Sequence, residues 1–599
     1  MNSPRDYGTE IFSLVRNLGP PPIESQNTLS ANLATAETRL VSLQRQHDEL
    51  VKEITSCNFT INAIRSLHSP WRRLPAELLR EIFSYCGPDK RTQLPSSRNV
   101  PFTLTQVCST WYRIATDIPQ LWTSVVLTSD HPYFPERLTH GTEYLRACAL
   151  RSKNAPLELH LSIHFIAYRP SYELIKRHSH QISTLSLHYP QSPNIPEDEQ
   201  FPVGSCTWFV HADPLIFPNL QSLEIHDPNT LDNLSEVDFN RLRFIADSAR
   251  CLRRYMFHNR LVQPKGPVLT NWTNITELTL IDPTPVTLLA HVLQNAPSLR
   301  FASFNSLCES LGLMVNQQMQ ALLSNPELFI PFTHDHLQTL LISYGDSATL
   351  VMLFNLVTLP KLNHLLLEKW TDDPDPWAQE AFVSFLVRSR CPLKALDFYF
   401  TPVTAADLVE ILKVPTVRIT LKELMLQNGH TESEKIIDND FCELLSLPPS
   451  LYLTETPAAE LLGSDTGRSA ICPNLEVIGL LGCLSCSKPA LVRMLRSRLD
   501  PNFNHRSTTV APSLPVSPQG RSSLKYFETD FSLDDAQQYL KPLLRDGLVT
   551  LLYDSNTNIL PTSEEEKKLL KRYISEGLEL WEYDPVQGSW GPTDFWMKV

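Results

Sequence analysis

The chain has 599 residues, of which 42% are hydrophobic and 20% are charged, and its formal net charge is −13. This length exceeds what one hydrophobic core accommodates, so two or more domains or one long repeat array are expected. The acidic balance, without a sustained Lys/Arg stripe, argues against nucleic-acid binding, and the absence of any run of about 18 apolar residues argues against a membrane span.

The first elements in chain order are a tail and a heptad repeat. Residues 1–27 are expected to be a disordered tail, and their opening stretch MNSPRDYGTE has no apolar core of a signal peptide. Residues 28–68 follow a seven-residue repeat in which two positions carry mostly apolar side chains. The spacing between these positions alternates between three and four residues. They are Leu33, Leu40, His47, Ile54 and Ile61 at one position and Leu29, Ala36, Leu43, Leu50, Cys57 and Ile64 at the other.

This repeat predicts one long, coiled-coil-like helix over residues 28–68. Two interpretations stay open. The seam pairs with another chain, for example in a homodimer through residues 29–64, or the helix folds back on its own protein. His47, Ala36 and Cys57 weaken the seam in either arrangement.

Residues 69–122 predict a compact unit of three short helices. The first covers residues 74–83, with Pro75 in its first turn and Gly87-Pro88 beyond its end. A polar loop follows to about residue 100. The second helix begins with Thr103 as a candidate N-cap, Pro119 breaks it, and a third short turn ends at Trp122. Helical spacing places these residues on one side of the second helix: Leu104, Val107, Cys108, Trp111 and Ala115.

From residue 123 onward, apolar residues recur as Leu-x-x-Leu-x-Leu. The clearest copies lie at 217–225, 274–280, 336–342, 359–367, 391–400, 421–427 and 472–481, with weaker copies at 182–189 and 251–257. Helical patterns lie between several of them, at 286–296, 348–357, 377–389, 405–413 and 490–499. A repeated strand followed by a helix predicts an irregular, leucine-rich-repeat-like solenoid over residues 123–553. An ordinary α/β sheet domain is the alternative.

The end of the chain is less regular. Residues 505–520 predict a disordered loop, and residues 524–527 and 548–552 predict late strands. Residues 554–599 are expected to form a C-terminal helix, opened by a capping box at Ser563–Glu566, and a tail. The expected fold class is therefore α/β: a long N-terminal helix, a three-helix unit, and a solenoid of short parallel strands and helices.

No motif predicts catalysis, a metal or a cofactor. Cys483 and Cys486 form one Cys-x-x-Cys pair, but no second pair with zinc-site spacing follows. Walker, Gly-x-Ser-x-Gly and His-Glu-x-x-His motifs are absent from the sequence. The 12 cysteines lie mostly in apolar patterns, which predicts reduced thiols in a cytoplasmic or nuclear protein.

Residues 71–122 resemble an F-box. The family pattern Leu-Pro-x-Glu-Leu is present at 74–78, Ile-Phe at 82–83 and Val-Cys-x-x-Trp at 107–111. The ending at 113–122 is similar to F-box proteins abundant in mushroom-forming fungi, which typically carry a preceding heptad-bearing helix and a following leucine-rich region. The loop between Phe83 and Val107 is longer than in compact F-boxes, so the resemblance carries over to the helices and not to the contacts of this loop.

The resemblance implies a substrate receptor. F-box proteins bind the Skp-type adaptor of a cullin ubiquitin ligase, and their second region captures the protein to be ubiquitinated. By family position the adaptor-binding residues are Leu74, Pro75, Leu78, Ile82, Val107, Cys108 and Trp111. Trp111 has the alternative of packing in the chain's own core. A unit of about 50 residues cannot bury all of its apolar side chains, so some must contact a neighbouring domain or a partner.

In the solenoid, alternating strand residues are expected to line the concave side and capture an unknown protein substrate. They are Glu224, His226, Glu277, Thr279, His364, Glu368, Asp397, Tyr399, Glu423 and Gln427. For each one, a solvated surface without a partner is the alternative. For the whole chain, the alternative is a non-catalytic scaffold that dimerises and does not engage a ubiquitin ligase.

Overall fold

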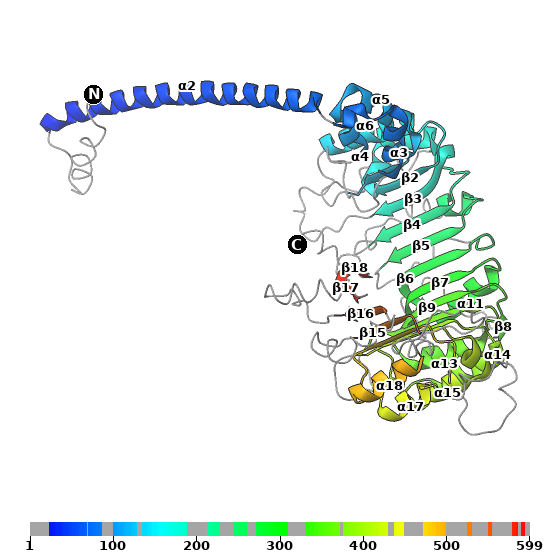
Figure 1. Cartoon of the computed structure of the whole chain (residues 1–599). Coiled ribbons are helices and arrows are strands. Elements are labelled where there is room, and N and C mark those ends of the chain that lie inside the picture. The colour runs from blue at the N-terminus through cyan, green and yellow to red at the C-terminus, as the bar shows by residue number, and fades with distance from the viewer. Residues whose placement is uncertain are drawn as a thin grey trace. The chain divides into compact units, whose positions relative to one another are not determined.

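The computed structural model of the chain divides into two compact units, Met1–Tyr85 and Cys86–Val599 (Figure 1). The structure describes residues 23–68, 70–86, 100–128, 135–188, 213–227, 244–259, 271–308, 330–371, 375–428, 436–447, 471–498, 524–529, 549–553, 578–584 and 589–592. The expected α/β fold class is confirmed: a long helix comes first in the chain, and a large parallel sheet with interspersed helices follows.

The first unit contains the predicted long helix. Helix α2 covers Ile23–Leu67, the 3-10 helix η1 covers Pro70–Arg73, and helix α3 covers Ala76–Tyr85. The 45 residues of α2 include no Gly or Pro, so nothing in them interrupts the backbone hydrogen bonds before Pro70. The predicted start at residue 28 was wrong, because residues 23–27 are already helical. The remaining expected tail, 1–22, lies outside the described residues.

In the second unit, parallel strands follow one another in chain order through one sheet (Figure 1). The strands are β1 (Ser124–Leu127), β2 (Leu157–Ser162), β3 (Ile182–His188), β4 (Ser222–Asp227), β5 (Arg254–Asn259), β6 (Glu277–Pro285), β7 (Phe301–Cys308), β9 (Thr339–Tyr344), β11 (His364–Lys369), β12 (Ala395–Tyr399), β13 (Glu423–Gln427), β14 (Val477–Leu481), β15 (Tyr526–Thr529), β16 (Val549–Tyr553), β17 (Leu578–Asp584) and β18 (Ser589–Pro592). Only the β17–β18 pair of this sheet is antiparallel among the described strands. A separate parallel pair joins β8 (Phe332–Thr333) and β10 (Val357–Thr358).

Helices connect many of these strands. They are α6 (Pro135–Arg151), α7 (Ile163–Ala167), α8 (Arg169–Arg177), α11 (Val286–Asn295), α13 (Ser347–Leu356), α14 (Gln379–Ser389), α15 (Ala405–Lys413), α16 (Pro415–Thr420), α17 (Asn439–Leu445) and α18 (Lys488–Arg498). The five helical segments predicted between strands correspond to α11, α13, α14, α15 and α18. Contacts of α11 with β6 and of α13 with β9 place these helices against the sheet.

The Leu-x-x-Leu-x-Leu pattern explains the sheet. Its central residues pair in register from strand to strand, for example Leu340 with Leu365 and Leu365 with Leu396. The row continues through Leu424 and Ile478, and each of these side chains is fully buried. All nine predicted segments form strands of the sheet, and the two late strands correspond to β15 and β16. Each repeat thus buries its apolar face against the neighbouring repeats, as a stacked array requires.

Backbone hydrogen bonds extend this ladder by one residue before most strands. The amides of Lys422 and Glu423 both donate to the carbonyl of Lys394, and the amides of Glu476 and Val477 both donate to that of Lys422. The same pair of hydrogen bonds occurs before earlier strands. For example, the amides of Gln338 and Thr339 both donate to the carbonyl of Arg300. The repeat therefore fixes the register of the strands, and with it the face to which each side chain points.

The predicted second helix of residues 69–122 is two helices. Helix α4 covers Val100–Val107 and helix α5 covers Ser109–Asp117, because Cys108 between them is extended with φ −164° and ψ 169°. The expectation of one continuous helix from Thr103 was therefore wrong. The third short turn is confirmed as the 3-10 helix η2, Pro119–Trp122.

Trp122 joins this region to the first coil of the solenoid. Its indole Nε1 donates to the carbonyl of Ala115 at 2.9 Å, and its ring is fully buried. Phe102 meets the ring edge-on at 5.4 Å between centroids, and the Arg151 guanidinium from α6 lies 4.3 Å from its centroid. The expected division between residues 122 and 123 therefore falls inside one packed core.

The sheet extends further than the expected 123–553. Strands β17 and β18 lie within 554–599, where we expected only a helix and a tail, and β17 pairs with β16. The antiparallel return of β18 ends the run of parallel pairing. The expected loop 505–520 and the helix after Ser563 lie outside the described residues.

Candidate protein-interaction surfaces

Helix α3 carries two apolar stripes with different environments. Leu79 and Phe83 are buried, whereas Leu78 is 52% exposed and Ile82 41%. Tyr85 continues the exposed stripe at the i, i+4, i+7 spacing of one helix face. The sequence prediction assigned Leu78 and Ile82 to adaptor binding and missed Tyr85. The helical spacing of Leu78, Ile82 and Tyr85 was the signal that could have identified it.

The residues before α3 are also accessible. Leu74 is half-buried, Pro75 is exposed, and the large ring of Trp71 in η1 is exposed. The amide of Leu74 donates to the carbonyl of Trp71 at 3.3 Å, which fixes the turn into α3. Pro75, whose missing N–H costs nothing at a helix start, then precedes the first residue of the helix.

The junction of α4 and α5 presents a second set of predicted residues. Val107 is 55% exposed, and Cys108 and Trp111 are half-buried. On the other side of these helices Leu104, Ile114 and Ala115 are buried. Val107, the last residue of α4, points outward at the helix break. The first hydrogen bond of α5 runs from the amide of Tyr112, which donates to the carbonyl of Cys108 at 2.8 Å.

None of the seven residues assigned to adaptor binding is buried. Leu74, Pro75, Leu78 and Ile82 lie in the first unit, and Val107, Cys108 and Trp111 lie in the second. Isolated exposed leucines are common on protein surfaces, but a repeated stripe of large apolar side chains on one short helix marks an interaction surface. Leu78, Ile82 and Tyr85 form such a stripe on α3, whereas in the second set only Val107 is mostly exposed.

The predicted capture residues lie on the sheet face opposite the buried row, and this face is called the outer face. Nine of the ten are half-buried or exposed, and Asp397 is buried. His364 on β11 and Asp397 on β12 are 2.8 Å apart from Nε2 to Oδ2, which explains the burial of Asp397. Glu224 and His226 on β4 are 3.5 Å apart. The register brings His364 and Asp397 together from two strands, whereas Glu224 and His226 are neighbours on the same face of one strand.

Several residues of the outer face were missed. His188 on β3 stacks on His226 with ring centroids 4.4 Å apart and 5° between planes, and Arg254 on β5 pairs with Glu277 on β6. The Ser343 hydroxyl donates to Glu368 at 2.6 Å. Each pair joins residues on different strands, so the sequence offers no local signal for it before the register is known.

Two histidines of this face have opposite pKa shifts. Burial, with smaller contributions from the nearby His226 and His160, lowers the pKa of His188 to about 3. The hydrogen bond to Asp397 raises the pKa of His364, against the opposing effect of burial. At neutral pH the outer face therefore holds His188 as a neutral stacking and hydrogen-bonding group, while His364 stays protonated to higher pH than a free histidine.

We expect the two histidines to give opposite pH dependence. A lowered pKa in the folded state means that the unfolded chain binds the proton more readily, so His188 reduces stability as pH falls below about 6.5. His364 has a raised pKa, so its contribution is present below about 6.5 and is lost as pH rises through its folded-state pKa. NMR titration of the imidazole Cε1–H resonances should show His364 titrating at higher pH than a free histidine, and His188 not titrating above pH 5. The His188→Gln and His364→Gln variants assign the signals, and titration of both near pH 6.5 would contradict the two environments.

The Cys-x-x-Cys residues have separate partners. The Cys483 thiol donates to the carbonyl of Leu426 at 3.8 Å, and the Cys486 thiol contacts that of Cys442 on α17. The Cys486 contact raises the pKa of the Cys442 thiol, as does burial. In the described part of the chain, no group of three or more His, Cys, Asp or Glu side chains has an arrangement that could hold a metal ion.

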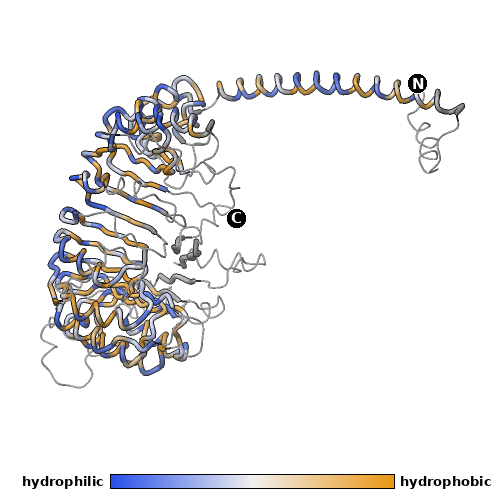
Figure 2. The backbone as a smooth tube through the Cα atoms, turned by 180° about the vertical axis from the view of Figure 1, so that it is seen from behind, coloured by the Kyte–Doolittle hydropathy of each residue, from blue (hydrophilic) through white to orange (hydrophobic). Residues whose placement is uncertain are grey.

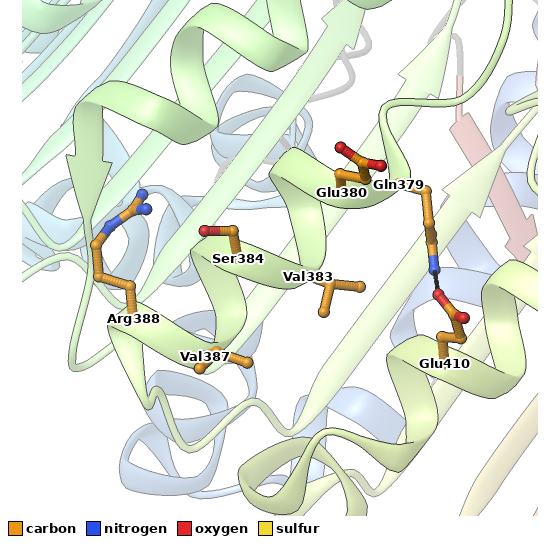
Figure 3. Close-up of a pocket in the computed structure, with 7 residues that line it drawn as sticks. All are labelled: Gln379, Glu380, Val383, Ser384, Val387, Arg388 and Glu410. Atoms are coloured by element: carbon orange, nitrogen blue, oxygen red, sulfur yellow. Dashed lines mark hydrogen bonds between the residues drawn. The ribbon is translucent and has the colours of Figure 1, made fainter.

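A shallow hollow of about 510 Å³ lies on the helical side, between α14 and α15 (Figure 3). Gln379 Nε2 donates to Glu410 Oε2 at 2.9 Å across one end of it. Its other lining residues are Glu380, Val383, Ser384, Val387 and Arg388. The lining combines aliphatic and charged groups without a histidine or a cysteine, so it offers no nucleophile–base pair of the usual kind.

Comparison with known families identifies one region. Residues 71–128 match the family model described as F-box-like. The match supports an F-box protein, and it extends past the expected end at 122 over strand β1, in agreement with the shared core around Trp122. The search of curated proteins found no match to this chain. Among the helices in the described ranges, none combines the length and apolar character of a membrane span.

Proposed function

We propose that this protein is the substrate-recognition subunit of a Skp-cullin-F-box ubiquitin ligase. In this proposal residues 71–128 dock on the Skp-type adaptor and, through it, on a cullin. The supporting observation is that all seven adaptor residues expected from the family pattern are at least partly exposed within the F-box-like match. A chain that used these side chains only for its own core would bury them.

The proposed role needs no catalytic group on this chain. A substrate receptor holds the target lysine near the ubiquitin-charged enzyme, and proximity converts a bimolecular encounter into an effectively intramolecular one. The protein would act in the cytoplasm or nucleus, where ubiquitin ligases of this class and reduced thiols are found. None of the 11 cysteines described by the structure forms a disulfide, which is compatible with that location.

The outer face of the leucine-rich-repeat-like sheet is the proposed capture surface. Strand after strand places short rows of polar and charged side chains about 4.8 Å apart, on a backbone whose register is fixed by the buried row. Such a surface suits recognition of a protein segment, because fixed side chains lose little entropy on binding. The outer-face pairs His364–Asp397 and Arg254–Glu277 hold their members in defined positions.

Target capture is tested by changing charge on the two sides of the solenoid. We expect Glu423→Arg, on the outer face, to remove most of the proteins other than the adaptor and the cullin that co-purify with the chain when the proteasome is blocked. Glu380→Arg is the matched control, since it makes the same change at an exposed position on the helical side. Quantitative mass spectrometry compares the two. Equal co-purification from both variants, together with retained adaptor binding, would contradict capture at this part of the outer face.

A second candidate is a non-catalytic scaffold that dimerises through residues 29–64 without engaging a ubiquitin ligase. Dimerisation is favoured by the heptad residues of α2, whose large apolar side chains are mostly exposed, and it is compatible with either function. Binding of the purified chain to a Skp-type adaptor in isothermal titration calorimetry separates them. The ligase proposal expects binding with a negative heat-capacity change from apolar burial, and the scaffold expects none.

A further inference from the structure

Helix α2 exposes a mostly apolar seam. Seven of the eight large aliphatic side chains at the two heptad positions are 46–60% exposed: Leu33, Leu40, Leu43, Leu50, Ile54, Ile61 and Ile64. The eighth, Leu29, is half-buried. Figure 2 shows apolar and polar residues alternating along the helix. No side chain between residues 28 and 65 is buried. Within the described residues of its own unit, Met1–Tyr85, nothing covers this seam.

A helix of 45 residues would be about 68 Å long at 1.5 Å per residue, and most helical stability in proteins comes from packing an apolar face. The spacing of the seam indicates what packs on it. A seven-residue repeat kept over about five heptads requires a helix with the same repeat, because only such a partner follows the seam as it winds around the helix. A second copy of α2 has this repeat and this length.

The polar member of the seam decides the orientation. With full overlap in a parallel, in-register pair, His47 faces His47 of the second copy. A shift by one heptad places it against Leu40 or Ile54, and the two antiparallel registers that use most of the seam place it against Leu43 or Leu50. Burying an imidazole against an aliphatic side chain leaves its nitrogens without a polar neighbour, which is unfavourable. A single polar residue at such a position commonly sets register in coiled coils.

Charged residues beside the seam do not oppose this arrangement. In the parallel pair Arg39 faces Gln44 of the second copy, and Glu53 faces Asn58, so no like charges meet across the flanks. The ion pair Arg45–Glu49, 3.4 Å apart, lies along the same helix and leaves the seam free.

We propose that α2 forms a parallel, in-register, two-stranded coiled coil with α2 of a second copy, which places Cys57 directly opposite Cys57. This inference goes beyond the proposed function and does not rest on it. Its consequence is a two-headed protein, because parallel pairing brings the carboxyl ends of both helices, and the residues 70–85 that follow, to one end of the coiled coil.

Oxidative cross-linking tests the orientation on the full chain. Diamide oxidises two facing thiols to a disulfide and takes up their two protons and two electrons to become the hydrazine. We expect a reducible Cys57–Cys57 dimer, absent in Cys57→Ser. The Leu40→Cys and Leu33→Cys variants distinguish the alternatives, since the two antiparallel registers that use most of the seam place residue 57 opposite residue 40 or opposite residue 33. A peptide map showing a 40–57 or a 33–57 bond in place of the bonds between identical positions would overturn the parallel arrangement.

Sedimentation tests the pairing itself. We expect the wild-type chain to sediment at twice its 68.1 kDa mass, and Leu43→Asp with Leu50→Asp to weaken dimerisation on the order of a hundredfold or more. Val41→Asp with Phe59→Asp is the matched control, because both side chains are exposed and apolar but lie outside the seam. A wild-type chain that stays monomeric at micromolar concentration would overturn the proposal. Adaptor binding, measured on the same variants, should not change, so the failure of one proposal is distinguishable from the failure of the other.

Discussion

Replacing Leu78 and Val107 together by aspartate should weaken binding to a Skp-type adaptor by roughly a thousandfold or more. Each side chain is about half exposed in the free protein. Burying the exposed half of each side chain contributes about 0.8–1.5 kcal/mol, and a carboxylate in its place costs about 1–3 kcal/mol more because it would be buried without a partner. Since 1.4 kcal/mol corresponds to a tenfold change in affinity, the loss of two such contacts gives the stated factor.

Folding of the double variant is the necessary control. Both positions are exposed, so we expect the thermal unfolding midpoint to stay near that of the wild type. Ile216→Asp is the matched substitution, because Ile216 is an exposed aliphatic side chain outside the F-box-like match of 71–128. It should leave adaptor binding unchanged. Wild-type affinity in a folded Leu78→Asp, Val107→Asp protein would refute the assignment of these residues.

The repeat strands were predictable because their signal is local. Each copy carries three apolar residues whose spacing alone places them inward, as with Leu362, Leu365 and Leu367 before and within β11. Strand β7 has the same spacing in Leu299, Ala302 and Phe304, but its small central residue hid the pattern. Strand β1 was missed because its first inward residue, Trp122, was counted with the preceding helices.

The break at Cys108 could not be predicted from its neighbours. Residues 104–115 have helical periodicity throughout and contain neither Gly nor Pro. The break follows from packing, because Trp122 contacts both helices. Its indole N–H donates to the carbonyl of Ala115 in α5, and the indole ring packs against Phe102 in α4. Tertiary contacts thus decide the orientation of the two helices, and with it the exposure of Val107.

The outer face was predictable one strand at a time. Alternation identified Glu224 and His226 as outward residues, but not that His188 stacks on His226 or that Arg254 pairs with Glu277. Those partners are separated by stretches of variable length, and only the register of adjacent strands brings them together. Side-chain pairs between strands are therefore the part of the site that requires the structure.

The register itself can be tested with two adjacent leucines of β11. We expect Leu365→Ala to lower the free energy of unfolding by about 2–5 kcal/mol, because Leu365 is fully buried between Leu340 and Leu396 in the central row and its loss leaves a cavity. Leu366→Ala removes the same atoms from the half-exposed outer face, and its cost should be below about 1 kcal/mol.

Urea unfolding followed by circular dichroism compares the two variants by their midpoints, since long repeat arrays need not unfold in a single two-state step. A shift of one residue in the register of β11 would exchange the faces of Leu365 and Leu366 and reverse the order of the two costs. It would also turn His364 and Glu368 into the core, where a charged side chain without a partner is strongly unfavourable. The order of the two leucine variants therefore tests both the repeat and the assignment of the outer face, since a larger loss for Leu366→Ala would contradict both.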